Sequence, residues 1–277
     1  MIAYIGGKYK MAEWISSYIP NDIETYGEIF GGAFWTYLKS DIYKYPNLKT
    51  VFYNDFNRFM VNLIECCREY ETFLNEIKEK NIISQNEDLF NKFRDEIIFN
   101  EKNNQISQIK IPDFELGYKY PYVLTQLFSG LGIKENVKMM NLQGKYKSKF
   151  DSFVKRLGNT EIQEKLNKIT ECTNLDFEKA AEKFDNNKSF LYFDPPYYHT
   201  ENYYSFHEFG LKDHERLSNV LKNLDGKFGL SYYYFDDLKK WFPEDKYRWI
   251  RKEFSKNSAA KKGIKQTKGE ELLILNY

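Results

Sequence analysis

Four consecutive residues, Asp194-Pro195-Pro196-Tyr197, place an acid, two rigid prolines and an aromatic ring directly after the apolar run 190–193. The run predicts a short buried strand, which the prolines end because they cannot donate backbone hydrogen bonds to a sheet. Asp194 is therefore expected at the carboxyl end of a core strand. In open α/β sheets that edge is where ligands bind.

These residue types suit the handling of an exocyclic amino group on a planar ring. The lone pair of such a nitrogen is delocalised, and two acceptors that each take one N–H would orient it toward an electrophile. Asp194 offers a carboxylate and Pro195 a carbonyl, while Tyr197 offers a face on which a base can stack. Base stacking on an aromatic ring contributes about 1–3 kcal/mol. A stiff turn without catalytic function is the alternative.

A glycine turn is expected earlier in the chain. A predicted strand near 26–30 leads through Gly31-Gly32 into an apolar helix, and such glycines let a cofactor approach the backbone. The spacing fits neither a dinucleotide motif nor a P-loop. About 20 residues later a second predicted strand ends at Asp55, which is placed to accept ribose hydroxyls. Capping of the following helix is the alternative role for Asp55.

Other segments complete the expected sheet. Gly6-Gly7-Lys8 at a helix start could meet an anion or carboxylate, with a simple loop as the alternative. A further strand is expected at 228–232. The apolar runs 247–250 and 272–277, separated by a basic loop, predict an antiparallel hairpin.

The composition excludes several classes. With 42% hydrophobic and 29% charged residues, the 277-residue chain is typical of a soluble globular protein. No apolar run approaches the roughly 18 residues of a membrane span, and the amino terminus lacks a signal-peptide core. The adjacent Cys66 and Cys67 form a poor disulfide pair, so we expect a cytoplasmic protein. The spacing of the three histidines matches no compact metal motif, so no metal is expected.

Residues 66–157 read as a helical insertion. The net charge is only +1, but basic residues concentrate within the insertion and again at 246–268. Local patches of this kind suit a surface that contacts phosphates and base edges. A solvated helical subdomain is the alternative. The candidate nucleic-acid contacts are Lys134, Asn136, Lys138, Lys145 and Lys147.

Taken in order, these segments resemble the Dam-type (D12 class) DNA adenine-N6 methyltransferases over nearly the whole chain. The matching segments are Tyr4-Ile5-Gly6-Gly7-Lys8, Glu28-Ile29-Phe30-Gly31-Gly32, Asn54-Asp55, Phe128-Ser129-Gly130-Leu131, Asp194-Pro195-Pro196-Tyr197, Ser231-Tyr232 and 271–277. The chain departs from the family at three positions: Ile29 stands where Pro is frequent, Phe34 where Gly is frequent, and Ser129 where Asn is frequent. The insertion also lacks an obvious arginine to grip guanine, so no recognition sequence is carried over.

The resemblance implies an α/β fold, with a Rossmann-like class I S-adenosylmethionine-dependent methyltransferase sheet ending in an antiparallel hairpin. Residues 1–65 and 158–277 would form the catalytic domain, and 66–157 an inserted helical DNA-recognition subdomain. The cofactor would be S-adenosyl-L-methionine. Its binding residues would be Tyr4, Lys8, Phe30, Gly31, Gly32, Asp55 and Asp194.

The resemblance also implies a substrate, an adenine flipped out of double-stranded DNA. Asp194 and Pro195 would hold its amino group, Pro196 completes the catalytic motif, and Tyr197 would stack on the base. Methylation of cytosine N4 or of RNA adenine, and a non-catalytic DNA-binding role, are the alternatives. The recognition sequence, the oligomeric state and the choice between restriction-modification, regulatory and phage roles stay open.

Overall fold

The computed structural model describes residues 7–82, 84–103, 105–108, 110–127, 132–140, 149–198, 209–255 and 268–277. Several positions that the sequence singles out lie outside these ranges. They are Tyr4, the segment 128–131, Lys145, Lys147, His199, His207 and residues 256–267 of the basic loop.

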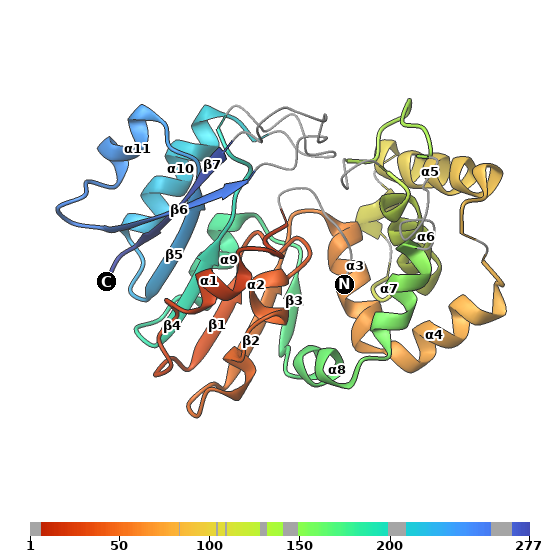
Figure 1. Cartoon of the computed structure of the whole chain (residues 1–277), viewed down its shortest axis with the longest axis horizontal. Helices are drawn as coiled ribbons and strands as arrows, with labels where there is room; N and C mark the ends of the chain where they lie inside the picture. Colours follow the sequence, from red (N-terminus) through yellow and green to blue (C-terminus); the bar gives the residue numbers. More distant parts are fainter. Residues whose placement is uncertain are drawn as a thin grey trace.

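A seven-stranded sheet forms one half of the molecule, with the strand order β3-β2-β1-β4-β5-β7-β6 (Figure 1). The strands are β1 (Thr25–Glu28), β2 (Thr50–Asn54), β3 (Glu171–Thr173), β4 (Ser189–Phe193), β5 (Lys227–Tyr232), β6 (Arg248–Ser255) and β7 (Lys268–Leu275). β1 to β5 run parallel, and β7 runs antiparallel to β5 and β6. The expected α/β class, with its closing antiparallel hairpin, is confirmed.

Both faces of the sheet are covered, which explains why its strands read as continuous apolar runs. Along β4, Phe190 and Tyr192 join one core cluster, while Leu191 and Phe193 join the other. Successive side chains of a strand point to opposite faces, so β4 supplies both layers. The first face carries α1 (Ala12–Ser16), α2 (Trp35–Leu38), η1 (Ile42–Lys44), α3 (Arg58–Arg68) and α8 (Thr160–Asn167). The second carries α9 (Phe177–Phe184), α10 (Leu211–Lys222) and α11 (Asp236–Trp241).

The segment between α3 and α8 is helical, as expected, and lies beside the sheet on the right of Figure 1. Its elements are α4 (Tyr70–Glu79), α5 (Glu87–Lys102), η2 (Gln105–Gln108), α6 (Phe114–Thr125) and α7 (Lys149–Leu157). α6 is buried along most of its length and packs against α3, α5, α4 and α7. The first core cluster continues without a break from the sheet into these helices.

Helix α10 begins at Leu211, two residues before Asp213. The Asp213 carboxylate accepts a hydrogen bond from the Gly210 N–H at 3.0 Å, so it caps the first turn from inside the helix. His214 is only 1% exposed and shares a hydrogen bond with the Tyr232 hydroxyl. His214 is therefore a core residue of the layer formed by α9, α10 and α11.

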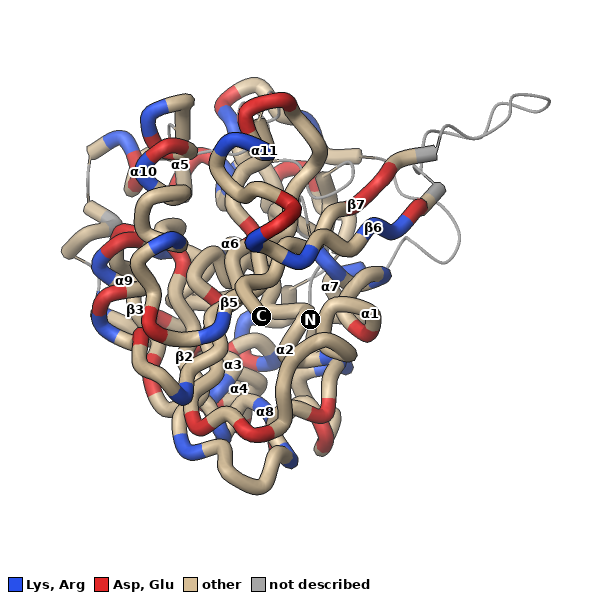
Figure 2. The backbone as a smooth tube through the Cα atoms, turned by 90° about the vertical axis from the view of Figure 1, so that its left-hand side faces the viewer, with Lys and Arg blue, Asp and Glu red and all other residues tan. Residues whose placement is uncertain are grey.

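Acidic and basic residues alternate along α9, α10 and α11 (Figure 2). Within the described ranges, no helix has the length and apolar character needed to cross a bilayer.

Candidate active site

The site lies between β1 and β4, where the order of the strands along the sheet reverses. β1 pairs with β2 on one side and β4 on the other, with Glu28 opposite Tyr192 in register. The loops that follow β1 and β4 therefore leave the same edge and diverge, which opens a crevice at a topological switch point. A pocket of about 970 Å³, measured out to its open mouth, fills this crevice.

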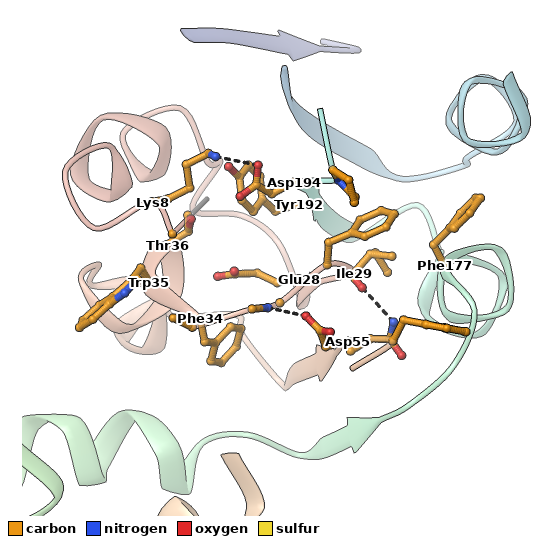
Figure 3. Close-up of a pocket in the computed structure, with 18 of the residues that line it drawn as sticks. Lys8, Glu28, Ile29, Phe34, Trp35, Thr36, Asp55, Phe177, Tyr192 and Asp194 are labelled. Carbon is orange, nitrogen blue, oxygen red and sulfur yellow. Dashed lines mark hydrogen bonds and ion pairs between the residues drawn. The ribbon is translucent and has the colours of Figure 1, made fainter. Parts of the chain in front are cut away.

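Asp194 directly follows β4 and lies at one end of the pocket, as expected (Figure 3). Its Oδ1 is 2.8 Å from the Lys8 Nζ, so two residues far apart in the sequence form an ion pair in the pocket wall. Burial raises the pKa of the Asp194 carboxyl, and the Lys8 ammonium opposes that shift. Lys8 also lies 3.4 Å from Glu271 on β7.

The two prolines and Tyr197 are buried against the sheet. The Tyr197 hydroxyl lies within hydrogen-bond reach of two carboxylates, Asp194 Oδ1 at 3.1 Å and Glu271, and donates its proton to one of them at a time. The Tyr197 ring stacks on Tyr232 at a centroid distance of 5.3 Å, and Tyr233 meets it edge-on at 4.4 Å. Tyr197 is 6% exposed. Its hydroxyl and one ring face are thus engaged within the protein, and stacking on a target base stays a prediction.

The glycine turn after β1 places the backbone against the pocket. A Cβ at Gly31 would lie 2.2 Å from the Tyr53 ring, so only glycine fits there. Gly32 adopts a positive φ of 47° and donates its N–H to Asp55 Oδ2 at 2.7 Å. Phe30 is half-buried and lines the pocket.

Asp55 also faces the pocket, with its second oxygen accepting the Asn57 N–H at 2.7 Å. Burial raises the pKa of Asp55 to about 6, against the two backbone hydrogen bonds. The N-cap of α3 is Asn57, whose side chain accepts from the Phe59 N–H. Asp55 therefore links the glycine turn after β1 to the loop before α3, and it does not itself cap α3.

Phe34, at the position where the resemblance suggests glycine, keeps the backbone conformation that glycine would allow. Its φ and ψ are 57° and 32°, in the left-handed region. Such a conformation costs a bulky residue roughly 1–2 kcal/mol. The side chain is fully buried, edge-on to Tyr53 at 5.1 Å, and this burial offsets the strain. The turn thus follows a glycine-like path despite the substitution.

Asn54 was part of the quoted pattern without a role, and the structure shows one. Its amide nitrogen donates to the carbonyls of Ile29 and Leu175 at 2.8 and 3.1 Å. Its amide oxygen accepts from the Leu175 N–H and the Thr173 hydroxyl. Asn54 therefore ties together the loops that follow β1, β2 and β3, so that all three line one pocket.

The structure adds pocket residues that sequence reasoning did not select. Glu28 accepts from the Tyr26 hydroxyl and the Tyr37 N–H, both at 2.9 Å, and burial raises its pKa to about 8. Thr36 is 1% exposed, and its hydroxyl has no hydrogen-bond partner in the described part of the chain. Phe177 lies at the opposite end (Figure 3), and Asp176 also lines the pocket. The available signal for Glu28 was its place in the quoted segment Glu28-Ile29-Phe30-Gly31-Gly32.

The described candidate contacts to nucleic acid lie away from this pocket. Lys134, Asn136 and Lys138 are exposed in the segment 132–140 that follows α6. The Arg94 guanidinium on α5 donates to the carbonyl of Val137 at 2.9 Å and holds the segment against the helices. The structure therefore groups these three residues with one another and not with Asp194.

The pocket suits an elongated ligand with several polar groups. In the described residues, no group of three or more His, Cys, Asp or Glu side chains is arranged to hold a metal ion. Instead, one end carries the Lys8–Asp194 pair and the hydroxyl of Thr36, the middle carries Glu28 and Asp55, and the far end carries Phe177 (Figure 3). Sheet order and pocket position together define the class I methyltransferase fold.

Comparison with known proteins gives the family. The model of the D12 class N6 adenine-specific DNA methyltransferases matches residues 4–257, and the chain belongs to this family. It is 22% identical over 223 residues to the type II methyltransferase M.FokI of Planomicrobium okeanokoites, covering 78% of this chain and 32% of that protein. It is 24% identical over 233 residues to the modification methylase StsI of Streptococcus sanguinis, covering 78% and 31%. The chain thus spans about a third of the length of these two relatives.

Proposed function

We propose that this protein transfers a methyl group from S-adenosylmethionine to the N6 atom of an adenine in double-stranded DNA. The observation that carries the proposal is the position of Asp194. Its carboxylate stands at the switch point of the sheet, beside the glycine turn, and lines the same pocket as Asp55 and Glu28. A family of adenine-specific DNA methyltransferases supplies the substrate class.

The pocket residues fit S-adenosylmethionine, which supplies an electrophilic methyl group on a sulfonium when it is bound. Asp55 is placed to accept the ribose hydroxyls. Phe30 and Phe177 stack at 5.7 Å between ring centroids and offer apolar surface to the adenine, with the Asp176 carboxylate as an acceptor for its amino group. Tyr4, outside the described residues, belongs to the same proposal.

The amino-acid end of the cofactor would lie near Lys8, Glu28 and Thr36. Burial raises the pKa of Glu28 to about 8 although Lys8 opposes the shift, so a ligand ammonium would further favour its ionised form. The Thr36 hydroxyl, which has no partner among the described residues, gains a hydrogen bond if the ligand's carboxylate or ammonium reaches it. Both features are those of a site built for a charged, polar ligand.

The target amine would be held by Asp194 and by the carbonyl of Pro195, with Pro196 fixing the turn. Two acceptors orient the N6 lone pair toward the methyl group, and positioning of this kind accounts for most of the acceleration. The duplex hides N6, so the base must be flipped out, and Tyr197 would stack on it. Lys134, Asn136, Lys138, Lys145 and Lys147 would contact the DNA around it.

The test is transfer of a labelled methyl group to unmethylated genomic DNA, followed by digestion and identification of the modified nucleoside. We expect N6-methyladenine, and no product from Asp194→Ala protein whose thermal unfolding is unchanged. N4-methylcytosine, or labelling of RNA alone, would replace the substrate in the proposal. Substantial activity in Asp194→Ala would overturn the mechanism, and failure to bind S-adenosylmethionine would favour a non-catalytic DNA-binding protein.

A further inference from the structure

A buried glutamate from the last strand reaches the catalytic loop. Glu271 on β7 is 3% exposed, whereas its neighbour Glu270 is exposed and pairs with Arg251 at 2.9 Å. Successive strand residues face opposite sides, so Glu270 points to solvent and Glu271 into the protein. A buried carboxylate is costly unless it is paired and hydrogen-bonded. The partners of Glu271 therefore indicate what it does.

Those partners are the groups that surround Asp194. The Lys8 Nζ lies 2.8 Å from Asp194 and 3.4 Å from Glu271, so two carboxylates share one ammonium. The Tyr197 hydroxyl lies within hydrogen-bond reach of the same two carboxylates. Lys8 also lies 4.8 Å from the centroid of the Tyr197 ring. Any change at Glu271 must therefore redistribute both the cation and the hydroxyl proton that reach Asp194.

The electrostatics support the same coupling. Burial raises the pKa of Glu271, and Lys8 opposes the shift, as it does for Asp194. Lys8 itself would lose affinity for its proton on burial, but the two carboxylates outweigh this and raise its pKa. The other ionisable groups that act on these residues come from β1, β4, the loop after β4 and the turn after β5. They are Glu28, Tyr192, Tyr197 and Tyr233.

We propose that Glu271 is a positioning residue of the catalytic site: it takes a share of Lys8 and holds the Tyr197 hydroxyl, and so sets the charge state of Asp194 and the orientation of the Tyr197 ring. The inference deepens the proposed function, because it assumes that Asp194 accepts an N–H of the target base. It gives the antiparallel hairpin a part in catalysis that its place at the end of the sheet does not suggest.

The first test compares Glu271→Gln with Glu270→Gln, the adjacent and exposed position on the same strand. Glutamine still accepts the Tyr197 hydroxyl but removes a negative charge, so Lys8 acts on Asp194 alone. We expect the acid limb of the single-turnover rate to move to lower pH by about one unit, with the plateau rate changed less than about threefold. Glu270→Gln should match the unaltered protein. Coincident profiles for all three proteins would overturn the proposal.

The second test isolates the hydroxyl. Glu271→Ala and Tyr197→Phe should each slow the single-turnover rate about tenfold, because each removes one end of the same hydrogen bond. The double variant should be no slower than either single variant, since residues that act through one interaction are not additive. Additive losses, or full activity in Glu271→Ala, would contradict the proposal. Tyr197→Phe and Glu271→Gln preserve side-chain size, so the outcome does not depend on the folding of Glu271→Ala.

A readout without turnover separates this inference from the proposed function. The Asp194 carboxyl carbon can be titrated by ¹³C NMR in the absence of DNA, with Asp194→Asn identifying the resonance. We expect Glu271→Gln to lower the titration midpoint by about one pH unit. A protein that shows this shift but methylates no DNA would refute the proposed function and keep the Glu271 inference. An active enzyme whose titration midpoint is unchanged by Glu271→Gln would refute the Glu271 inference and keep the proposed function.

Discussion

At the scale of single residues, the proposed ribose contact depends on the protonation state of the Asp55 carboxyl. Its carboxylate already accepts two backbone N–H groups, from Gly32 and Asn57, and burial holds its pKa at about 6. Its ionised form is the better acceptor, because hydrogen bonds to a charged oxygen are the stronger ones. The protonation of Asp55 should therefore control the affinity for the ribose.

We expect the affinity for 5′-methylthioadenosine to be constant above pH 7 and to fall about tenfold as the pH drops through 6, roughly 1.4 kcal/mol. This ligand lacks the amino-acid end, so Glu28 and Lys8 are not involved. Asp55→Asn should bind weakly at every pH in this range. Calorimetric titration at several pH values measures both effects, and a pH-independent affinity in the unaltered protein would refute the role of Asp55.

Gly31 decides the shape of the turn. Alanine there would place a methyl group 2.2 Å from the fully buried Tyr53 ring and 3.0 Å from the Asn54 carbonyl. We expect Gly31→Ala to cost about 1–3 kcal/mol of stability and to weaken cofactor binding. The control is Gly158→Ala, where the nearest atom lies 3.8 Å away. Chemical denaturation of the two variants compares them, and equal stabilities would count against this packing.

At the scale of elements, the segment 132–140 of the insertion forms part of the proposed DNA surface. It carries Lys134 and Lys138 toward solvent, while α9 to α11 show mixed charges. If the two lysines neutralise phosphates, counterion release makes DNA affinity depend steeply on salt. The element, more than any one side chain, would then determine where the duplex lies.

We expect Lys134→Ala and Lys138→Ala each to reduce the slope of log affinity against log salt by about 0.9. The weakening should be similar for all DNA sequences, because phosphate contacts carry no sequence information. Lys222→Ala, an exposed position on α10, is the matched control and should leave the slope unchanged. Fluorescence anisotropy at several salt concentrations measures the slopes, and a flat response in the unaltered protein would exclude both contacts.

At the scale of the whole molecule, the insertion and the sheet share a core. Phe59 on α3 stacks on Tyr120 of α6 at 5.2 Å, and the Asn57 amide donates to the Tyr120 hydroxyl at 2.8 Å. Asn57 in turn donates its N–H to Asp55. The insertion is therefore packed against the loop that lines the proposed cofactor pocket, and the proposed division at 66–157 does not separate two cores.

We expect calorimetry to show one thermal transition, because separating the insertion would expose the apolar face shared by α3 and α6. S-adenosylhomocysteine should move the whole transition to higher temperature, since a ligand that binds only the folded state stabilises everything that unfolds with its site. Two transitions, with only the first or the second moved by the ligand, would show that the insertion folds independently.

The sequence by itself determined the sheet and the ends of its strands. Apolar runs buried on both faces predicted β1, β2, β4, β5 and the closing hairpin, and the residues that follow them, Asp55 and Asp194, line the pocket. Strand patterns are local, and in a parallel sheet the carboxyl ends necessarily meet at one edge. The family resemblance rested on the same positions, and the family match confirms it.

Only the tertiary structure decided which distant side chains meet. Lys8, Asp194 and Glu271 come from the two ends and the middle of the chain, and no local spacing relates them. Asn54 looked like part of a strand end, yet its amide joins three loops. Phe34 looked like a departure from the family's turn, yet its backbone follows the glycine path. Such contacts depend on the packing of the whole core, which a linear pattern does not encode.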